Sequence, residues 1–529
     1  MALIVVWYGA VYFTVRPLTE APVGDSWVYE HAVTHFNRTG TIQFPGFTAA
    51  IPVAQVLYGV AWSRVFGETS RSLDISTVLL GIVGGILFYG LARKCGADAS
   101  ISAVATALII CNPCYLFLSF SFMTEVPFLV LLLASYLAFA YAIYGSRQKW
   151  LWLASAAAAA GFAIRPFAAA TIAGEAAALL VRGGAQSRAK WSRKIRAAVP
   201  LIVALIACLG FWIWFIMLHP EPWKLGYDEY RLWNYFTLVP LRVYLVGGVL
   251  APAIYLGIVL SPLGILHAIQ RWRQSTLITG VVLVSSITIV RLGHEPVRNL
   301  EQMTCFGGSY GALVLSGTPQ YDFSVALASI LLIVGAVGFA GICHAWCKAI
   351  QNTNCVVWAV LFAGAIYWVA IPLLWLFADR YYLVLVPAAC LPLALAPLPR
   401  RHSVITGASL MTAALGFISA RGLVSYHRTM QQIVMQSENL LRRGIPREQI
   451  DAGYSLNGRD LYVYPAEGIT EEREPLIPLI IGSTTLPYII STSPLPNRTV
   501  WQKFSGCGPL GFGRRPLFVL KANTPFSSP

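Results

Sequence analysis

Long runs of apolar residues recur at short intervals from the start of the chain to about residue 421. Many approach the roughly 20 residues that a helix needs to cross a ~30 Å hydrocarbon core. The pattern therefore predicts an all-α polytopic membrane protein with about 13 transmembrane helices over residues 1–421. The runs lie at about 1–16, 73–92, 100–118, 126–145, 150–164, 167–182, 198–218, 243–268, 275–291, 322–345, 355–377, 382–398 and 403–421.

The pattern changes in the last part of the chain, residues 422–529, which is richer in charge, Gly and Pro. An amphipathic stretch at 423–443 predicts a helix. Short strand-like pieces follow at 461–464, 488–490 and 517–520. This part is predicted to be a small C-terminal α/β domain outside the membrane.

Composition agrees with a membrane protein, since 57% of residues are hydrophobic, 12% are charged and the mean hydropathy is +0.64. Soluble domains carry about 25% charged residues. The net charge of +15 comes from short basic clusters between the apolar runs, for example at 93–94, 147–149, 188–196, 271–273 and 400–401. Such clusters mark cytoplasmic loops. They indicate a plasma (inner) membrane topology with a cytoplasmic N-terminus and an external tail, and no nucleic-acid partner.

The loops assigned to the opposite side contain ionisable residues at or near the ends of apolar runs. Charged groups at that depth are costly and usually face a cavity or a partner. The first of these loops, 19–72, is long enough for two interfacial helices, at 26–36 behind Asp25 and at 49–62. The others are at 123–125, 165–166, 221–231, 291–301 and 379–382.

Five local patches resemble one family when taken in order. They are GDSW around Asp25, SFMTEVPFL with Glu125, GFAIRPFA with Arg165, ADRYYLVLVPAACL with Arg380 and Tyr381, and DAGYSLNG at 451–458. Together they resemble the GT-C glycosyltransferases, in the branch of bacterial relatives of protein O-mannosyltransferase and lipid A aminoarabinose transferase.

The resemblance implies a hexosyl- or pentosyltransferase that takes its sugar from a polyprenyl-phosphate donor on the external membrane face, with inversion at the anomeric carbon. It implies that Asp25 is the catalytic base. Many relatives have two adjacent acids there, whereas Asp25 is followed by Ser26, so a second carboxylate must come from elsewhere. Expected partners are this donor, membrane lipids and an acceptor protein, lipid or wall glycan.

The remaining candidates follow from what sugar transfer requires. Arg165 and Arg380 suit a phosphate leaving group, because guanidinium binds phosphate in a bidentate manner, and Tyr381 adjoins them in this role. The two arginines are therefore predicted to approach one polar cavity. Glu125 orients the acceptor or holds a divalent metal with Asp25.

Each candidate also has a structural interpretation. Asp25 is a suitable helix cap, and Glu125 stands where an acid favours a helix N-terminus. The arginines can extend to lipid headgroups, and Tyr381 suits an interfacial aromatic belt. The alternatives for the whole protein are a membrane transporter of a lipid-linked or small solute, which usually shows a repeat and midplane charges, and a membrane scaffold.

The ten cysteines show no metal-ligand spacing. Cys111 and Cys114 have the interval of a zinc or redox pair but lie within an apolar run, which favours packing. Cys305 and Cys507 are the two cysteines assigned to the external side, so a disulfide between them is compatible with the topology.

Overall fold

The structure is a computed structural model that describes residues 1–16, 18–45, 48, 51–145, 147–182, 191–218, 249–270, 272–291, 315–317, 325–351, 354–371, 379–398, 402–462, 486–508 and 513–523. Its helices are α1 (Ala2–Val15), α2 (Ser26–Thr39), α3 (Val53–Phe66), α4 (Ser70–Lys94), α5 (Ala99–Ile110), α6 (Pro113–Ser119), α7 (Glu125–Gly145), α8 (Gln148–Phe162), α9 (Ala169–Arg182), α10 (Trp191–Leu218), α13 (Ala251–Val259), α14 (Ser261–Gln270), α15 (Trp272–Arg291), α17 (Val325–Gln351), α18 (Cys355–Ala370), α19 (Val386–Leu395), α20 (His402–Arg442) and α21 (Tyr454–Leu461). Three 3-10 helices are also described: η1 (Pro166–Ala168), η7 (Asp379–Leu385) and η8 (Arg447–Gln449).

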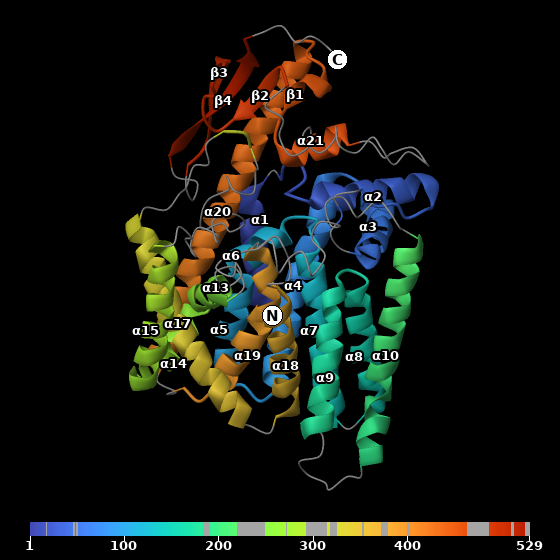
Figure 1. Cartoon of the computed structure of the whole chain (residues 1–529), viewed down its shortest axis with the longest axis vertical. Coiled ribbons are helices and arrows are strands. Elements are labelled where there is room, and N and C mark those ends of the chain that lie inside the picture. The colour runs from blue at the N-terminus through green and yellow to red at the C-terminus, as the bar shows by residue number, and fades with distance from the viewer. Residues whose placement is uncertain are drawn as a thin grey trace.

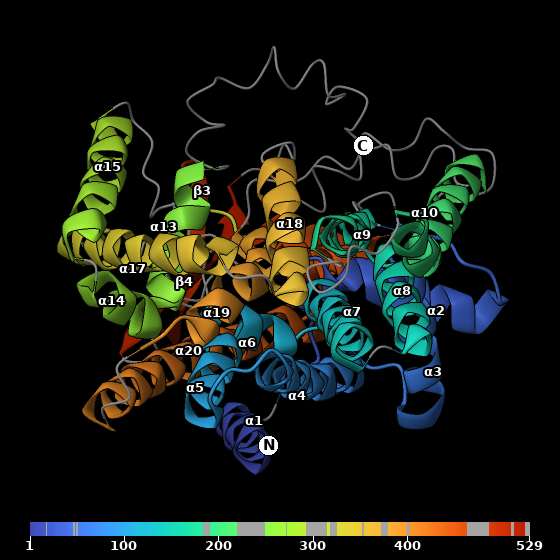
Figure 2. The ribbon, with the colours of Figure 1, turned by 90° about the horizontal axis from the view of Figure 1, so that it is seen from below.

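Within the described residues, each predicted apolar run overlaps one helix or two consecutive helices. Among the described residues, five helices are long and apolar enough to cross a membrane, or seven if each of two bent pairs is one span. A polytopic helical membrane protein is thus supported, while the number of thirteen spans stays a prediction. In Figure 2, α7 to α10 lie on one side of the bundle and α13, α14, α15 and α17 on the other.

Local sequence explains the 64° bend between α5 and α6. Proline follows Asn112 and lacks the N–H that would continue α5. The side chain of Asn112 instead begins α6, because its Oδ1 accepts from the backbone N–H groups of Cys114 at 2.9 Å and Tyr115 at 3.3 Å. Cys111 and Cys114 are both buried, which confirms their assignment to packing.

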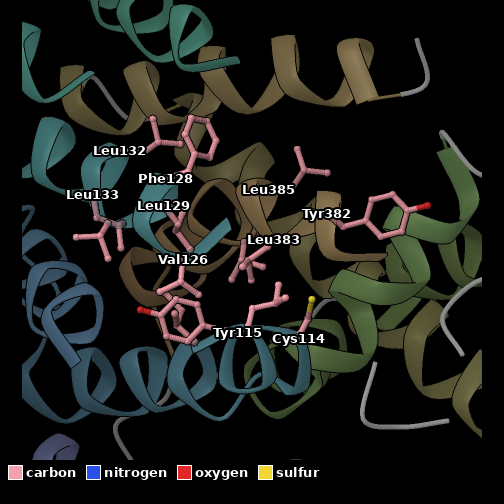
Figure 3. Packing of buried hydrophobic residues seen from close by; sticks show 14 of the residues in the cluster. Cys114, Tyr115, Val126, Phe128, Leu129, Leu132, Leu133, Tyr382, Leu383 and Leu385 are labelled. Carbon is pink, nitrogen blue, oxygen red and sulfur yellow. The ribbon is translucent and has the colours of Figure 1, made fainter. Parts of the chain in front are cut away.

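The short helix η7 is held against α6 and α7 by a dense apolar contact. Figure 3 shows Tyr115 of α6, Val126 and Leu129 of α7, and Leu383 of η7 converging on one another. All four side chains are buried. This packing brings the first residues of α7 and of η7 together, although 254 positions separate Glu125 from Asp379 in the sequence (379 − 125).

The C-terminal region forms a four-stranded sheet of order β1-β2-β4-β3, in which β1 pairs with β2 in parallel and the other pairs are antiparallel. The strands are β1 (Ile450–Asp451), β2 (Tyr488–Ser491), β3 (Arg498–Cys507) and β4 (Arg514–Ala522). Figure 1 shows the sheet, α21, α2 and α3 at the same end of the molecule. The predicted strands at 488–490 and 517–520 are therefore confirmed.

Two details of the C-terminal prediction differ from the structure. The helix expected at 423–443 is the second part of α20, a continuous helix of 41 residues, so the predicted boundary at 421/422 falls within a helix. No proline interrupts α20 between its apolar first half and its amphipathic second half, so the helix continues. Leu461 ends α21 instead of starting a strand. Residues 463–464, Cys305, and the loops at 221–231 and 292–301 lie outside the described residues.

Candidate active site

Four charged side chains of alternating sign form one cluster at the end of the bundle where α2 begins. Arg380 Nη2 lies 2.6 Å from Asp25 Oδ2, and Arg380 Nε lies 3.4 Å from Glu125 Oε1. Arg165 Nη2 lies 2.6 Å from the same oxygen of Glu125. The two carboxylates and two guanidinium groups balance, so the cluster has no formal net charge.

Each member sits where a helix begins. Asp25 immediately precedes α2, Glu125 is the first residue of α7, Arg165 precedes η1, and Arg380 is the second residue of η7. Asp25 occupies the N-cap position, yet its side chain makes no capping hydrogen bond. The capping interpretation of Asp25 is therefore wrong, because its carboxylate is engaged by Arg380 instead.

The cluster is most open at Asp25. The exposed fraction of the side chain is 4% for Glu125, 6% for Arg380 and 12% for Arg165, but 27% for Asp25. Charges removed from water interact more strongly than exposed ones. A molecule arriving from outside would thus meet the Asp25 carboxylate first, with the guanidinium groups behind it.

Tyr381 lies beside both guanidinium groups. Its ring centroid is 5.4 Å from Cζ of Arg165 and 5.3 Å from Cζ of Arg380, which is cation–π range. The predicted proximity of Arg165 and Arg380 is confirmed, since both line one pocket together with Glu125 and Tyr381. The interpretation of the two arginines as separate headgroup anchors does not agree with this geometry. The remaining walls of the pocket are Phe128, Phe167, Tyr367, Ile371 and Val384.

Three polar atoms of the cluster are buried without a hydrogen bond among the described residues, and one of them, Arg380 Nε, is within ion-pair distance of Glu125. Arg380 Nη1 and Glu125 Oε2 have no hydrogen-bond partner within the part of the chain that the structure describes. An unpaired buried donor is costly. The cluster therefore offers a donor and an acceptor to a polar ligand, although the pocket itself has only about 20 Å³ of space for water.

A fifth residue, which the sequence interpretation did not single out, contacts the cluster. The hydroxyl of Tyr454, from α21, donates to Asp25 Oδ1 at 2.8 Å. Tyr454 belongs to the DAGYSLNG patch at 451–458, but no local feature of the sequence connects it with Asp25. Thr124 was missed similarly, and its Oγ1 accepts from Arg165 Nε at 2.9 Å.

The surroundings change the protonation of Asp25 and Tyr454. Burial alone would raise the pKa of Asp25, but the charge and hydrogen bond of Arg380, with the hydroxyl of Tyr454, lower it below its ordinary value. Burial, and then the charge of Asp25, raises the pKa of Tyr454 well above its ordinary value. At neutral pH, Asp25 is thus an ionised acceptor and Tyr454 a donor.

The cluster does not fit the divalent metal that Asp25 and Glu125 were expected to hold. The Arg380 guanidinium lies between the two carboxylates and pairs with both of them. A cation placed there would meet this positive group at close range. No step of the chemistry below is therefore assigned to a metal.

Other ionisable residues of the first external loop have structural contacts. Glu30 accepts from the hydroxyls of Ser26 at 3.0 Å and Ser70 at 2.6 Å, which connects α2 to α4. His31 Nε2 contacts the backbone carbonyls of Gly458 and Arg459. Neither side chain reaches Arg380 or Arg165 among the described contacts.

A family model described as dolichyl-phosphate-mannose-protein mannosyltransferase matches residues 52–214. This match confirms, over that part of the chain, the resemblance to GT-C membrane glycosyltransferases. The matched segment includes Glu125 and Arg165, whereas Asp25, Arg380 and Tyr454 lie outside it. No curated protein matches the chain.

The chain also aligns with solved structures of other proteins. ArnT from Cupriavidus metallidurans, bound to undecaprenyl phosphate, has 13% identity and a TM-score of 0.47, with 84% of this chain and 72% of ArnT covered. The oligosaccharyltransferase AglB from Archaeoglobus fulgidus, with an inhibitory peptide and a dolichol-phosphate, has 15% identity and a TM-score of 0.43. That alignment covers 88% of this chain and 60% of AglB.

Proposed function

We propose that the protein is an inverting glycosyltransferase that moves a hexosyl or pentosyl group from a polyprenyl-phosphate donor to an acceptor on the external membrane face. The observation that supports this most is Arg380, a buried guanidinium held between two carboxylates with its Nη1 donor unused among the described residues. The family match over residues 52–214 agrees with the same reaction class.

The leaving phosphate would bind at Arg380 and Arg165. Both guanidinium groups face one pocket, and a developing phosphate charge is stabilised most effectively by positive groups already in place and shielded from water. The unused Nη1 of Arg380 supplies a donor without breaking the pair with Asp25. Because the pocket has only about 20 Å³ of space for water, the surrounding side chains would move apart when the donor binds.

Asp25 would act as the base. Its ionised carboxylate would take the proton of the acceptor hydroxyl while the hydroxyl oxygen forms a bond to the anomeric carbon. The bond between that carbon and the phosphate oxygen breaks, and its electron pair leaves with the polyprenyl phosphate. Attack opposite the leaving group inverts the configuration.

The position of the reaction in the cell is part of the proposal. Helix α2, which Asp25 immediately precedes, and the C-terminal sheet lie at one end of the bundle (Figure 1). The basic clusters of the apolar segment assign that end to the outside of the plasma membrane. The acceptor would therefore be a protein, lipid or wall glycan of the cell envelope.

The test uses purified full-length protein in detergent with a polyprenyl-phosphate sugar, and it measures release of polyprenyl phosphate. Asp25→Asn keeps the size of the side chain but removes the base, so the rate should fall by about 100- to 10,000-fold. A detergent solution holds no ion gradient, so donor turnover also separates an enzyme from a transporter.

The matched control is Asp98→Asn. Asp98 caps α5 by accepting from the backbone N–H of Ser100 at 2.9 Å, and Asn caps about as well as Asp. This variant should retain the parental rate. An Asp25→Asn variant that kept more than about a tenth of the rate would contradict the role of Asp25 as base.

A further inference from the structure

The carboxylate of Asp25 is held at both oxygens by groups that lie far from it in the sequence. Arg380 binds Oδ2 at 2.6 Å, and the Tyr454 hydroxyl binds Oδ1 at 2.8 Å. Tyr454 comes from α21 in the C-terminal region, 429 positions away from Asp25. Two different parts of the chain therefore determine where this carboxylate points.

Helix α21 is attached to α2 by contacts that leave little room for displacement. A Cβ atom on Gly458 would lie 2.3 Å from the Trp27 ring, so only glycine permits this approach. The Trp27 and Tyr454 rings meet edge to face, with centroids 5.9 Å apart. His31 Nε2 lies within 3.2 Å of two backbone carbonyls, of Gly458 and Arg459, and must carry the hydrogen because carbonyls only accept.

The DAGYSLNG patch builds the turn that presents Tyr454. Asp451 Oδ1 accepts from the backbone N–H of Gly453 at 3.0 Å and from Asn457 Nδ2 at 2.8 Å. Asn457 Oδ1 in turn accepts from the backbone N–H of Ala452 at 3.0 Å. Gly453 has a φ of +90°, a backbone conformation that residues with a side chain rarely adopt. The polar residues of the patch thus stabilise the start of α21 directly before Tyr454.

We propose that Tyr454 is a positioning residue that orients the Asp25 carboxylate, so that the C-terminal region completes the active site of the membrane bundle. This inference rests on the proposed role of Asp25 as the base. With Oδ2 engaged by Arg380 and Oδ1 by Tyr454, the carboxylate cannot rotate away from the acceptor. A loosely held base loses the benefit of preorganisation.

The charged and titratable groups near Asp25 come from five elements. They are Arg380 of η7, Tyr454 of α21, Arg165 before η1, Glu125 of α7 and Tyr29 of α2. A hydrogen bond to the ionised form lowers the pKa of a carboxyl group. Removing the Tyr454 hydroxyl should therefore raise the pKa of Asp25. Because the ionised base is the active form, the loss of rate on acidification should then begin at a higher pH.

The experiment compares the full-length parent with Tyr454→Phe and Tyr488→Phe in detergent. Tyr488 lies in β2 of the same region and packs against Trp501 at a tilted angle, with ring centroids 5.2 Å apart. Rates with a polyprenyl-phosphate sugar are measured against pH. Separately, carbodiimide labelling of Asp25, which requires the protonated carboxyl, is followed by mass spectrometry over the same pH range.

Tyr454→Phe should lower kcat by about 10-fold or more, with little change in the KM of the donor, because a hydrogen bond to a charged group is lost. Both the acid limb of the rate profile and the labelling midpoint should move to higher pH, and Tyr488→Phe should change neither. An unchanged kcat and labelling midpoint in Tyr454→Phe would overturn the inference. A parent protein that consumes no donor would overturn the proposed function instead. In that case, a labelling midpoint that moves in Tyr454→Phe would still show that the Tyr454 hydroxyl stabilises the ionised Asp25 carboxylate.

Discussion

Two buried glutamates of the bundle have opposite surroundings. Glu125 is paired with the guanidinium groups of Arg165 and Arg380. Glu175 of α9 is fully buried and lies 2.8 Å from the hydroxyl of Ser135, and no cation of the described residues lies within ion-pair distance. Burial of an acid is therefore not sufficient to identify a site in this protein. Glu125 differs from Glu175 because it is paired with cations, and one of these cations, Arg380, also has an unused hydrogen-bond donor among the described residues.

The surroundings of the two glutamates meet at Tyr367. This residue lines the pocket beside Glu125, and its hydroxyl lies 2.9 Å from Thr171 Oγ1, which lies 3.2 Å from the Tyr136 hydroxyl. The pocket thus has charged side chains and, at Tyr367, a wall residue whose hydroxyl is connected to two further buried hydroxyl groups behind it. Satisfied hydroxyl chains make a core rigid, whereas the charged side chains still have hydrogen-bonding capacity for a ligand.

The largest effect is expected from Arg380→Gln, which removes the cation shared by Asp25 and Glu125. Transfer should fall by about 1,000-fold, comparable to losing a main transition-state donor. Stability should fall by about 3 kcal/mol, because Asp25 loses its ion-pair partner and Glu125 loses one of its two, while Arg165 still pairs with Glu125. Initial rates and thermal unfolding in detergent measure the two effects.

Arg380→Lys separates the two losses. It restores the charge but lacks the planar fork that addresses Asp25 and a phosphate together. We expect most of the stability to return and little of the rate. A lysine variant with the parental rate would show that Arg380 acts as a simple counter-ion.

The comparison itself is tested by making the same change at both glutamates. Glu125→Gln should lower the rate by about 100-fold, because Arg165 loses its ion-pair partner, Arg380 keeps only Asp25, and both guanidinium groups shift. Glu175→Gln should change the rate by less than about 3-fold, since a glutamine oxygen still accepts from Ser135. Equal losses at the two positions would mean that the glutamates serve only packing, or that the connected hydroxyl groups are part of the site.

The smallest effect is expected from removing divalent cations. Because Arg380 occupies the space between Asp25 and Glu125, dialysis against a chelator should leave the transfer rate within about 2-fold of the untreated enzyme. A loss that added Mg²⁺ or Mn²⁺ restores would show that the carboxylates release Arg380 to bind a metal during turnover.

The sequence alone located nearly all helices and most of the cluster. In a membrane, apolar runs of spanning length form helices because the backbone has no water to hydrogen-bond with. Within the described residues, each predicted run overlaps one helix or two consecutive helices. Asp25, Glu125, Arg165 and Arg380 stood out because ionisable residues at the ends of such runs are rare. These inferences depend on hydropathy, on neighbours along the chain and, for the role of Asp25, on the resemblance to GT-C glycosyltransferases.

Tertiary structure alone decided the partners of these residues. Asp25 meets Arg380 across 355 positions and Tyr454 across 429, and hydropathy contains no information on how far each helix is rotated toward its neighbour. The packing of α6, α7 and η7 sets that rotation (Figure 3). The same contacts overrode a local rule, because a guanidinium 2.6 Å away competes more strongly for the Asp25 carboxylate than the backbone N–H groups of α2. Asp25 therefore pairs with Arg380 instead of capping its own helix.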